Sequence, residues 1–111
     1  MNLALQASPS FSADSDKQVA WYVEHASEQV ARRYTEALAR TLDKLRENPD
    51  VGSLCKFRHV KLRGLRFCLV ARPFHKHIVF YRHDERTLYV ERVMHGARNL
   101  PRRLVEPPET G

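Results

Sequence analysis

Basic residues and histidines gather in the second half of the sequence, where they could bind or cleave a phosphodiester. Lys61, Arg63 and Arg66 surround Gly64 in the segment KLRGLR. A second set lies on and after two later predicted strands: Arg82, Arg92, His95, Arg98, Arg102 and Arg103. Guanidinium groups and an imidazole around a site without carboxylates suit phosphate binding, or phosphodiester cleavage without a metal. The sets converge only if the strand order brings them together.

The alternative for these arginines is structural: they line an exposed sheet face or pair with Asp84, Glu85 and Glu91. Other catalytic motifs are missing, since the sequence contains no GxSxG, P-loop or HExxH segment.

Two histidines raise the question of a metal site. His75 and His77 would share one face of a strand and could bind a metal with His59 or Cys55, but a third fixed ligand is missing. We therefore expect no metal and no cofactor. Cys55 and Cys68 are interpreted as packing residues, because they are too far apart for a CxxC motif.

The charge is unevenly divided along the chain, whose net charge is +6. Residues 1–55 carry six Lys and Arg against eight Asp and Glu, whereas residues 56–111 carry thirteen against five. The basic second half predicts an acidic partner, either nucleic acid or an acidic protein. A solvated basic surface that keeps the protein soluble is the alternative.

A chain of 111 residues forms one domain, which we place at 1–104, followed by a polar, proline-rich tail at 105–111 that we expect to be disordered. No apolar run approaches the roughly 18 residues of a membrane span. The first residues lack the regions of a secretory signal, and the two cysteines fit a reducing compartment. We therefore expect a cytoplasmic protein without a membrane partner.

The first half predicts a strand and a helical hairpin. The segment NLALQA alternates and predicts a strand over 2–7. Ser15, followed by Gln18, has capping-box spacing and predicts the start of a helix. An apolar stripe with helical spacing then runs to Leu45, and Ser27 predicts a break near 25–29 into two helices. The segment ENPDVG ends the second helix.

The second half changes to the period of strands. Three segments, 65–72, 75–82 and 87–94, predict an antiparallel meander, with the turn HDER before the last strand. Helices followed by strands predict an α+β fold, with the hairpin on one sheet face, the other face partly open and a short helix near the C-terminus. We expect a core of Trp21, Tyr34, Leu38, Leu42, Leu45, Phe67, Leu69 and Phe80.

Several short motifs follow one another in a characteristic order: ENPDVG, LRGLRF, ARPF, IVFYR and LYVERVMHGARNLP. Together they resemble the ParE/RelE superfamily of bacterial toxins from type II toxin–antitoxin modules, from the first strand to about Leu104. The resemblance implies the strand, hairpin and meander predicted above. It also implies a separately encoded, acidic antitoxin that wraps the toxin, with operator DNA contacted only through that antitoxin.

The superfamily divides by target. RelE-like members are ribosome-dependent endoribonucleases that cut mRNA, and this resemblance would make Lys61, Arg63, Arg66 and His95 the catalytic set. RelE-like nucleases commonly place a tyrosine after the last strand, whereas here nothing after Tyr89 is aromatic.

ParE-like members poison DNA gyrase by binding it and stabilising its cleaved DNA complex. The segments PF, IVFYR and RVMHGARNLP are closer to ParE-like sequences. We therefore favour a non-enzymatic gyrase inhibitor over a ribonuclease. The expected target-binding residues are Arg82, Arg92, His95, Arg98, Arg102 and Arg103.

Overall fold

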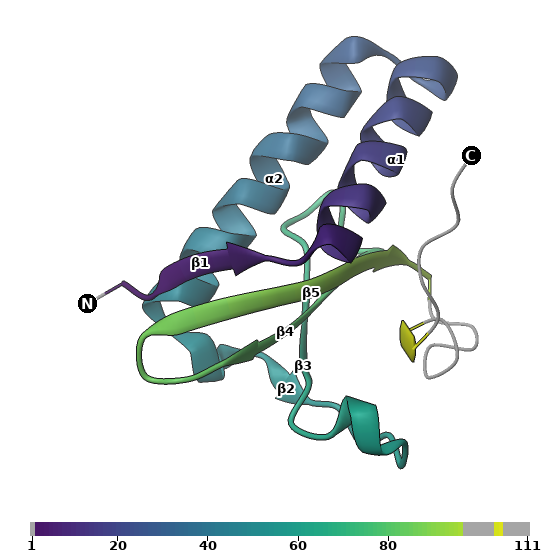
Figure 1. The fold of residues 1–111 in the computed structure, drawn as a ribbon. Coiled ribbons are helices and arrows are strands. Elements are labelled where there is room, and N and C mark those ends of the chain that lie inside the picture. The colour runs from purple at the N-terminus through teal and green to yellow at the C-terminus, as the bar shows by residue number, and fades with distance from the viewer. Residues whose placement is uncertain (1, 97–103, 106–111) are drawn as a thin grey trace.

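The computed structural model of the chain describes residues 2–96 and 104–105. Its main elements are β1 Ala4–Ala7, α1 Pro9–His25, α2 Glu28–Glu47, β2 Ser53–Leu54, β3 Arg66–Leu69, β4 His77–His83 and β5 Thr87–His95 (Figure 1). Two 3-10 turns, η1 Pro49–Val51 and η2 Val60–Leu62, flank β2. The predicted α+β fold is confirmed.

The sheet has the order β1-β5-β4-β3-β2. Strands β3, β4 and β5 form the predicted antiparallel meander, whereas β1 pairs with β5 in parallel. The helical hairpin therefore belongs to the long connection between β1 and β5, which are neighbours in the sheet. The sequence did not predict β2, because a strand of two residues is too short to show alternation.

Serines begin both helices, although only one was identified from the sequence. Ser27 caps α2 by accepting a hydrogen bond from the Val30 N–H at 3.1 Å, which confirms the predicted break. The predicted start at Ser15 is wrong. Ser8 caps α1 instead, accepting from the Phe11 N–H at 2.9 Å, and proline follows at the first helical position, where its missing N–H costs nothing.

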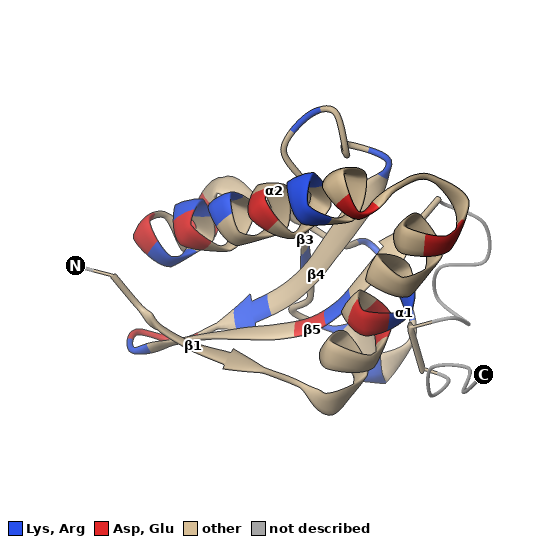
Figure 2. Ribbon diagram, turned by 90° about the horizontal axis from the view of Figure 1, so that it is seen from above, with Lys and Arg blue, Asp and Glu red and all other residues tan. Residues whose placement is uncertain are grey.

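The main core lies between the hairpin and one face of the sheet (Figure 1). Helix α2 contributes Tyr34, Ala37, Leu38, Leu42 and Leu45 to this core, and the strands contribute Val79, Tyr81, Leu88, Val90 and Val93. Helix α1 adds one buried side chain, Phe11, and packs against α2 and β5. Charged residues of both signs alternate along the outer surface of α2 (Figure 2).

Three residues of the predicted core are less buried than expected. Trp21 is 51% exposed because the adjacent Tyr22 takes the inward direction of α1, and consecutive helical residues point about 100° apart. Leu69 is 49% exposed at the end of β3, and Phe67 is only partly buried. Both face away from the helices, because Phe67 pairs with Phe80 on the opposite sheet face.

A second, smaller apolar cluster covers part of that opposite face. It contains Leu62, Leu65, Phe80 and Met94, with Leu104 and Val105 packed against it. The segment before β3 therefore folds back beneath the sheet, which leaves this face less open than we expected.

Some predictions fall on residues near the C-terminus. Residues 104–105 are helical, while the rest of the expected short helix and the tail at 106–111 lie outside the described residues. Within the described ranges, no helix is long and apolar enough to cross a membrane.

Candidate functional site

The segment KLRGLR forms a corner that is fixed to the sheet. Leu62 and Leu65 are buried beneath it, and Gly64 makes the turn with φ +77°, a conformation that favours glycine. The guanidinium of Arg82, on β4, donates hydrogen bonds to the backbone carbonyls of Lys61 and Arg63. A side chain from the second predicted basic set therefore clamps the backbone of the first.

A cavity of about 350 Å³ lies between this corner, β5 and the start of α1. Its lining consists of Ser8, Ser10, Lys61, Leu62, Leu65, Arg82, Glu91, Arg92, Leu104 and Val105. Lys61, Arg82 and Arg92 thus lie around one cavity. The sequence alone could not predict this, because it depends on the strand order. The α1 N-terminus adds its partial positive charge beside the two serines.

Arg82 is partly neutralised. Its Nε lies 3.6 Å from Glu91 Oε1 across the β4–β5 pair, which realises one of the ion pairs considered in the alternative interpretation. Asp84 serves the β4–β5 turn instead, where it accepts hydrogen bonds from the N–H groups of Arg86 and Thr87 at 2.8 Å each. These backbone hydrogen bonds lower the pKa of the Asp84 carboxyl.

Arg92 has a structural role in place of the exposed one we expected. The residue is 8% exposed, and its guanidinium binds both carboxylate oxygens of Asp14, with Nε 2.6 Å from Oδ2 and Nη2 2.8 Å from Oδ1. Asp14 also accepts a hydrogen bond from the Val93 N–H. This bidentate pair ties α1 to β5 and consumes most of the charge that Arg92 brings to the cavity.

Ser8 is a cavity residue that sequence reasoning missed. Its hydroxyl donates to the Glu91 carbonyl at 2.6 Å while it accepts from the Phe11 N–H. The signal was available, because serine before a proline that opens a helix is typical of an N-cap. Ser8 therefore fixes the start of α1 against the strand that lines the cavity.

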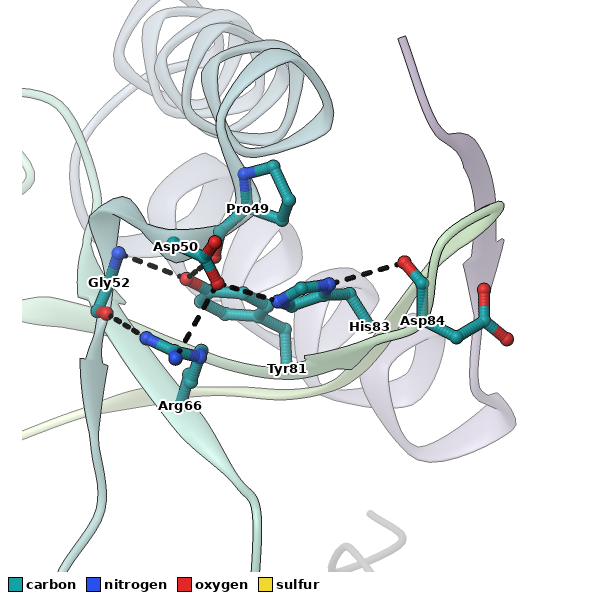
Figure 3. A network of polar contacts seen from close by, with 7 residues as sticks. All are labelled: Pro49, Asp50, Gly52, Arg66, Tyr81, His83 and Asp84. Carbon is teal, nitrogen blue, oxygen red and sulfur yellow. Dashed lines mark hydrogen bonds and ion pairs between the residues drawn. The ribbon is translucent and has the colours of Figure 1, made fainter.

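Arg66 lies in a polar network at the other side of the corner (Figure 3). Its Nη1 donates to the Gly52 carbonyl at 2.8 Å, and its Nη2 lies 3.5 Å from Asp50 Oδ1. The Tyr81 hydroxyl in the same network donates to the Pro49 carbonyl at 2.6 Å and accepts from the Gly52 N–H at 3.0 Å. Arg66 therefore helps to hold the connection from α2 to β2.

His83 closes this network. Its Nε2 lies 3.0 Å from Asp50 Oδ1 and its Nδ1 lies 3.2 Å from the Asp84 carbonyl (Figure 3). His83 therefore links the Asp50 carboxylate to the start of the β4–β5 turn.

His95 lies at the far end of β5, where it faces His77 on β4 with ring centroids 4.9 Å apart. His95 is exposed, whereas His77 is 1% exposed and its Nε2 lies 2.8 Å from the Tyr22 hydroxyl. Burial, and then the nearby His95, lower the pKa of His77 to about 4. His77 is therefore a neutral core residue.

The expected pairing of His75 and His77 on one strand face is wrong. His75 is exposed and precedes β4, so the two side chains occupy different environments. Among the residues that the structure describes, no three His, Cys, Asp or Glu side chains gather as a metal site would require.

The candidate ribonuclease residues do not converge. Arg66 pairs with Tyr81 and His95 with His77, so four residue steps along β4, about 13 Å at the usual rise of a strand, separate them. They also lie on strands that flank β4 on opposite sides. Of the expected target-binding residues, Arg98, Arg102 and Arg103 lie outside the described residues.

Comparison with known proteins identifies the family of the chain. The family model for the ParE toxin of the type II toxin–antitoxin system parDE matches residues 5–100. The chain belongs to the ParE toxin family. The match spans both helices, all of the sheet except Ala4, and every residue that lines the cavity except Leu104 and Val105.

Solved structures support the ParE toxin fold. A chain from the chromosomal ParDE toxin–antitoxin system of P. aeruginosa is 15% identical, with a TM-score of 0.68 over 86% of this chain and 97% of that chain. A chain from the RelBE2 toxin–antitoxin complex of Mycobacterium tuberculosis is 17% identical, with a TM-score of 0.56 over 86% of this chain and 99% of that one. No curated protein matches the sequence.

Proposed function

We propose that this toxin arrests growth by binding DNA gyrase and stabilising its cleaved DNA complex, and that a cognate acidic antitoxin neutralises it. The proposal rests on membership of the ParE toxin family. The two structural neighbours are toxin–antitoxin systems, which supports an antitoxin partner for this chain.

The separation of Arg66 from His95 favours an inhibitor over the ribonuclease alternative. A general base and the groups that stabilise a phosphorane must lie within hydrogen-bond reach of one phosphodiester. Here Arg66 is bound to Gly52 and Asp50, while His95 lies at the far end of the sheet beside His77. An inhibitor needs no such convergence, since a few anchoring side chains supply most of the binding energy of an interface.

A paired assay tests the proposal. Purified toxin should inhibit supercoiling by gyrase and cause gyrase-linked DNA breaks to accumulate, while translation of a reporter mRNA continues. The double variant Arg98→Ala with Arg102→Ala should restore supercoiling, because arginine is a favoured anchor at interfaces. Arg32→Ala with Arg33→Ala, which removes equal charge from exposed positions on α2, should leave inhibition unchanged.

The opposite result identifies the alternative function. Prompt cleavage of mRNA within translated codons, together with normal supercoiling, would show the toxin to be a ribosome-dependent nuclease. In that event the exposed Lys61→Ala and Arg63→Ala variants should lose cleavage by about a hundredfold.

A further inference from the structure

The segment from residue 51 to residue 83 contains no acidic residue. It carries eight Lys and Arg residues between Asp50 and Asp84. Four of the eight, Lys56, Arg58, Lys61 and Arg63, lie in the loop that joins β2 to β3 (Figure 1). We call these four residues the basic ridge.

The side chains of the basic ridge are exposed and uncompensated. All four residues are exposed, in contrast to Arg66 and Arg82, which bind backbone carbonyls and carboxylates within the fold. Across residues 2–96 and 104–105, none of the ion pairs involves a member of the ridge. Four like charges on a short loop repel one another, and a bound polyanion would relieve this repulsion.

The backbone of the ridge is fixed before any partner binds. Leu62 and Leu65 are 4% and 2% exposed and anchor the loop in the second apolar cluster. The Arg82 clamp holds two of its carbonyls, and the His59 Nδ1 accepts a hydrogen bond from the Lys61 N–H at 3.1 Å. A preorganised loop loses little entropy on binding, so its charges can contribute more of their attraction to affinity.

From these observations we infer that the basic ridge binds the phosphodiester backbone of duplex DNA without regard to sequence. The inference rests on the proposed function, because it assigns the ridge to the DNA in the gyrase complex. Lys and Arg side chains that replace condensed counterions at phosphates supply this kind of binding.

The composition of the ridge favours duplex DNA over single-stranded RNA. Proteins that recognise single-stranded RNA commonly stack its bases on exposed aromatic rings. Phe57, the one Phe, Tyr or Trp in residues 56–63, is partly buried in the second cluster. The ring of His59 is held by the Lys61 N–H.

The composition also argues against an acidic protein as the partner of the ridge. The strongest anchors of protein interfaces are Trp, Tyr and Arg side chains packed into desolvated pockets, and residues 56–63 contain no Trp or Tyr. Within residues 56–63, Val60 is the one large apolar side chain that is exposed, at 66%. Backbone phosphates need only the cations.

Fluorescence anisotropy with a labelled duplex of 20 base pairs, over a series of salt concentrations, tests the inference. If the ridge contacts about four phosphates, the logarithm of affinity should fall with the logarithm of salt concentration with a slope of about −3.5. Lys56→Gln with Arg58→Gln should reduce the magnitude of the slope by about 2 and weaken binding at least tenfold at low salt.

A matched variant controls for net charge. Arg72→Gln with Lys76→Gln removes the same charge from exposed positions in the loop at the opposite end of β3. It should weaken duplex binding about twofold and leave the slope nearly unchanged. Both double variants change exposed side chains, so their thermal unfolding should match that of the parent.

Three results would overturn the inference: no binding of the parent protein to the duplex, equal losses in the two double variants, or tighter binding of the ridge to single-stranded RNA or polyglutamate of equal charge. These results leave the proposed function standing if the parent protein still poisons gyrase. Conversely, ridge-dependent duplex binding by a protein that leaves gyrase unaffected would support the DNA surface and reject the proposed function.

Discussion

The hydroxyl of Tyr81 occupies the space that a side chain at residue 52 would need. A Cβ on Gly52 would lie 2.3 Å from Tyr81 Oη and 2.7 Å from the Phe67 carbonyl oxygen. The same hydroxyl accepts a hydrogen bond from the Gly52 N–H and donates one to the Pro49 carbonyl. Tyr81 can make these hydrogen bonds because residue 52 has no side chain.

Gly52→Ala should therefore destabilise the fold by about 1–3 kcal/mol, the usual cost of overpacking. Urea denaturation measures the loss. In a Tyr81→Phe background the nearest clashing atom is gone, so the same substitution should cost less. Additive effects of the two substitutions would contradict this coupling.

Arg92→Ala should cost about 3–5 kcal/mol, because it leaves the Asp14 carboxylate buried without its partner. Arg82→Ala should cost less, since its Glu91 partner is only partly buried and can exchange the lost contact for solvent. Unfolding in urea distinguishes the two variants. An Arg92→Ala protein as stable as the parent would return Arg92 to the set of residues available for a target.

Stability should depend on pH through His77. Its pKa is about 4 in the folded protein against 6.5 for the free side chain, so between these values the unfolded chain binds more protons. The free energy of unfolding should therefore rise with pH through this window and level off above about pH 7, a total change of about 3 kcal/mol.

Variants locate this pH dependence. Tyr22, Tyr34 and His95 are the titratable side chains whose rings contact His77. His77→Gln should flatten the profile between pH 4 and 7, and the exposed His75→Gln should keep it. An unchanged slope in His77→Gln would assign the effect to other groups.

Tyr34→Phe should leave stability unchanged or raise it by about 1 kcal/mol. The Tyr34 hydroxyl is buried and has no hydrogen-bond partner among the described residues, and burial raises the pKa of this phenol. Tyr22→Phe should instead destabilise by about 1 kcal/mol, because it removes the hydrogen bond to His77. Thermal unfolding of both variants tests the contrast, and a clear loss in Tyr34→Phe would reveal a partner for its hydroxyl.

Association with the cognate antitoxin should be faster at low ionic strength, because the second half of the toxin carries a net charge of +8. Stopped-flow mixing in dilute and in roughly physiological salt measures the rate. A rate that does not change with salt would mean that the basic half faces something other than the antitoxin.

Local signals in the sequence predicted those parts of the fold that local chemistry decides. Ser27 marks the break between the helices, and the alternation after residue 65 marks the meander. Serine next to proline marked the start of α1 equally well, but the capping-box spacing at Ser15 competed with it. The position of β1 beside β5 could not be predicted, because pairing between distant segments depends on the whole sheet.

The sequence predicted which residue types the candidate site contains, but not how they are arranged. The types of Lys61, Arg82 and Arg92 indicated a basic site, and the cavity brings them together. Their individual states depend on distant partners: Asp14 neutralises Arg92, and the carbonyls of the corner engage Arg82. Such pairings depend on the strand register, which includes an irregularity between Phe80 and Tyr81.

The parallel pairing of β1 with β5 sets the order in which a newly made toxin can become complete. Ala4 pairs with Thr87, so β1 cannot pair until β5 has been synthesised. At roughly 5–20 residues per second, that interval of about eighty residues lasts several seconds. The Arg92–Asp14 pair closes later still, so the contacts of β1 and α1 with β5 form only after β5 has been synthesised. The basic cavity, which Glu91 and Arg92 of β5 help to line, is therefore absent until β5 has been synthesised. An antitoxin already present in the cell can reach the nascent toxin during this interval.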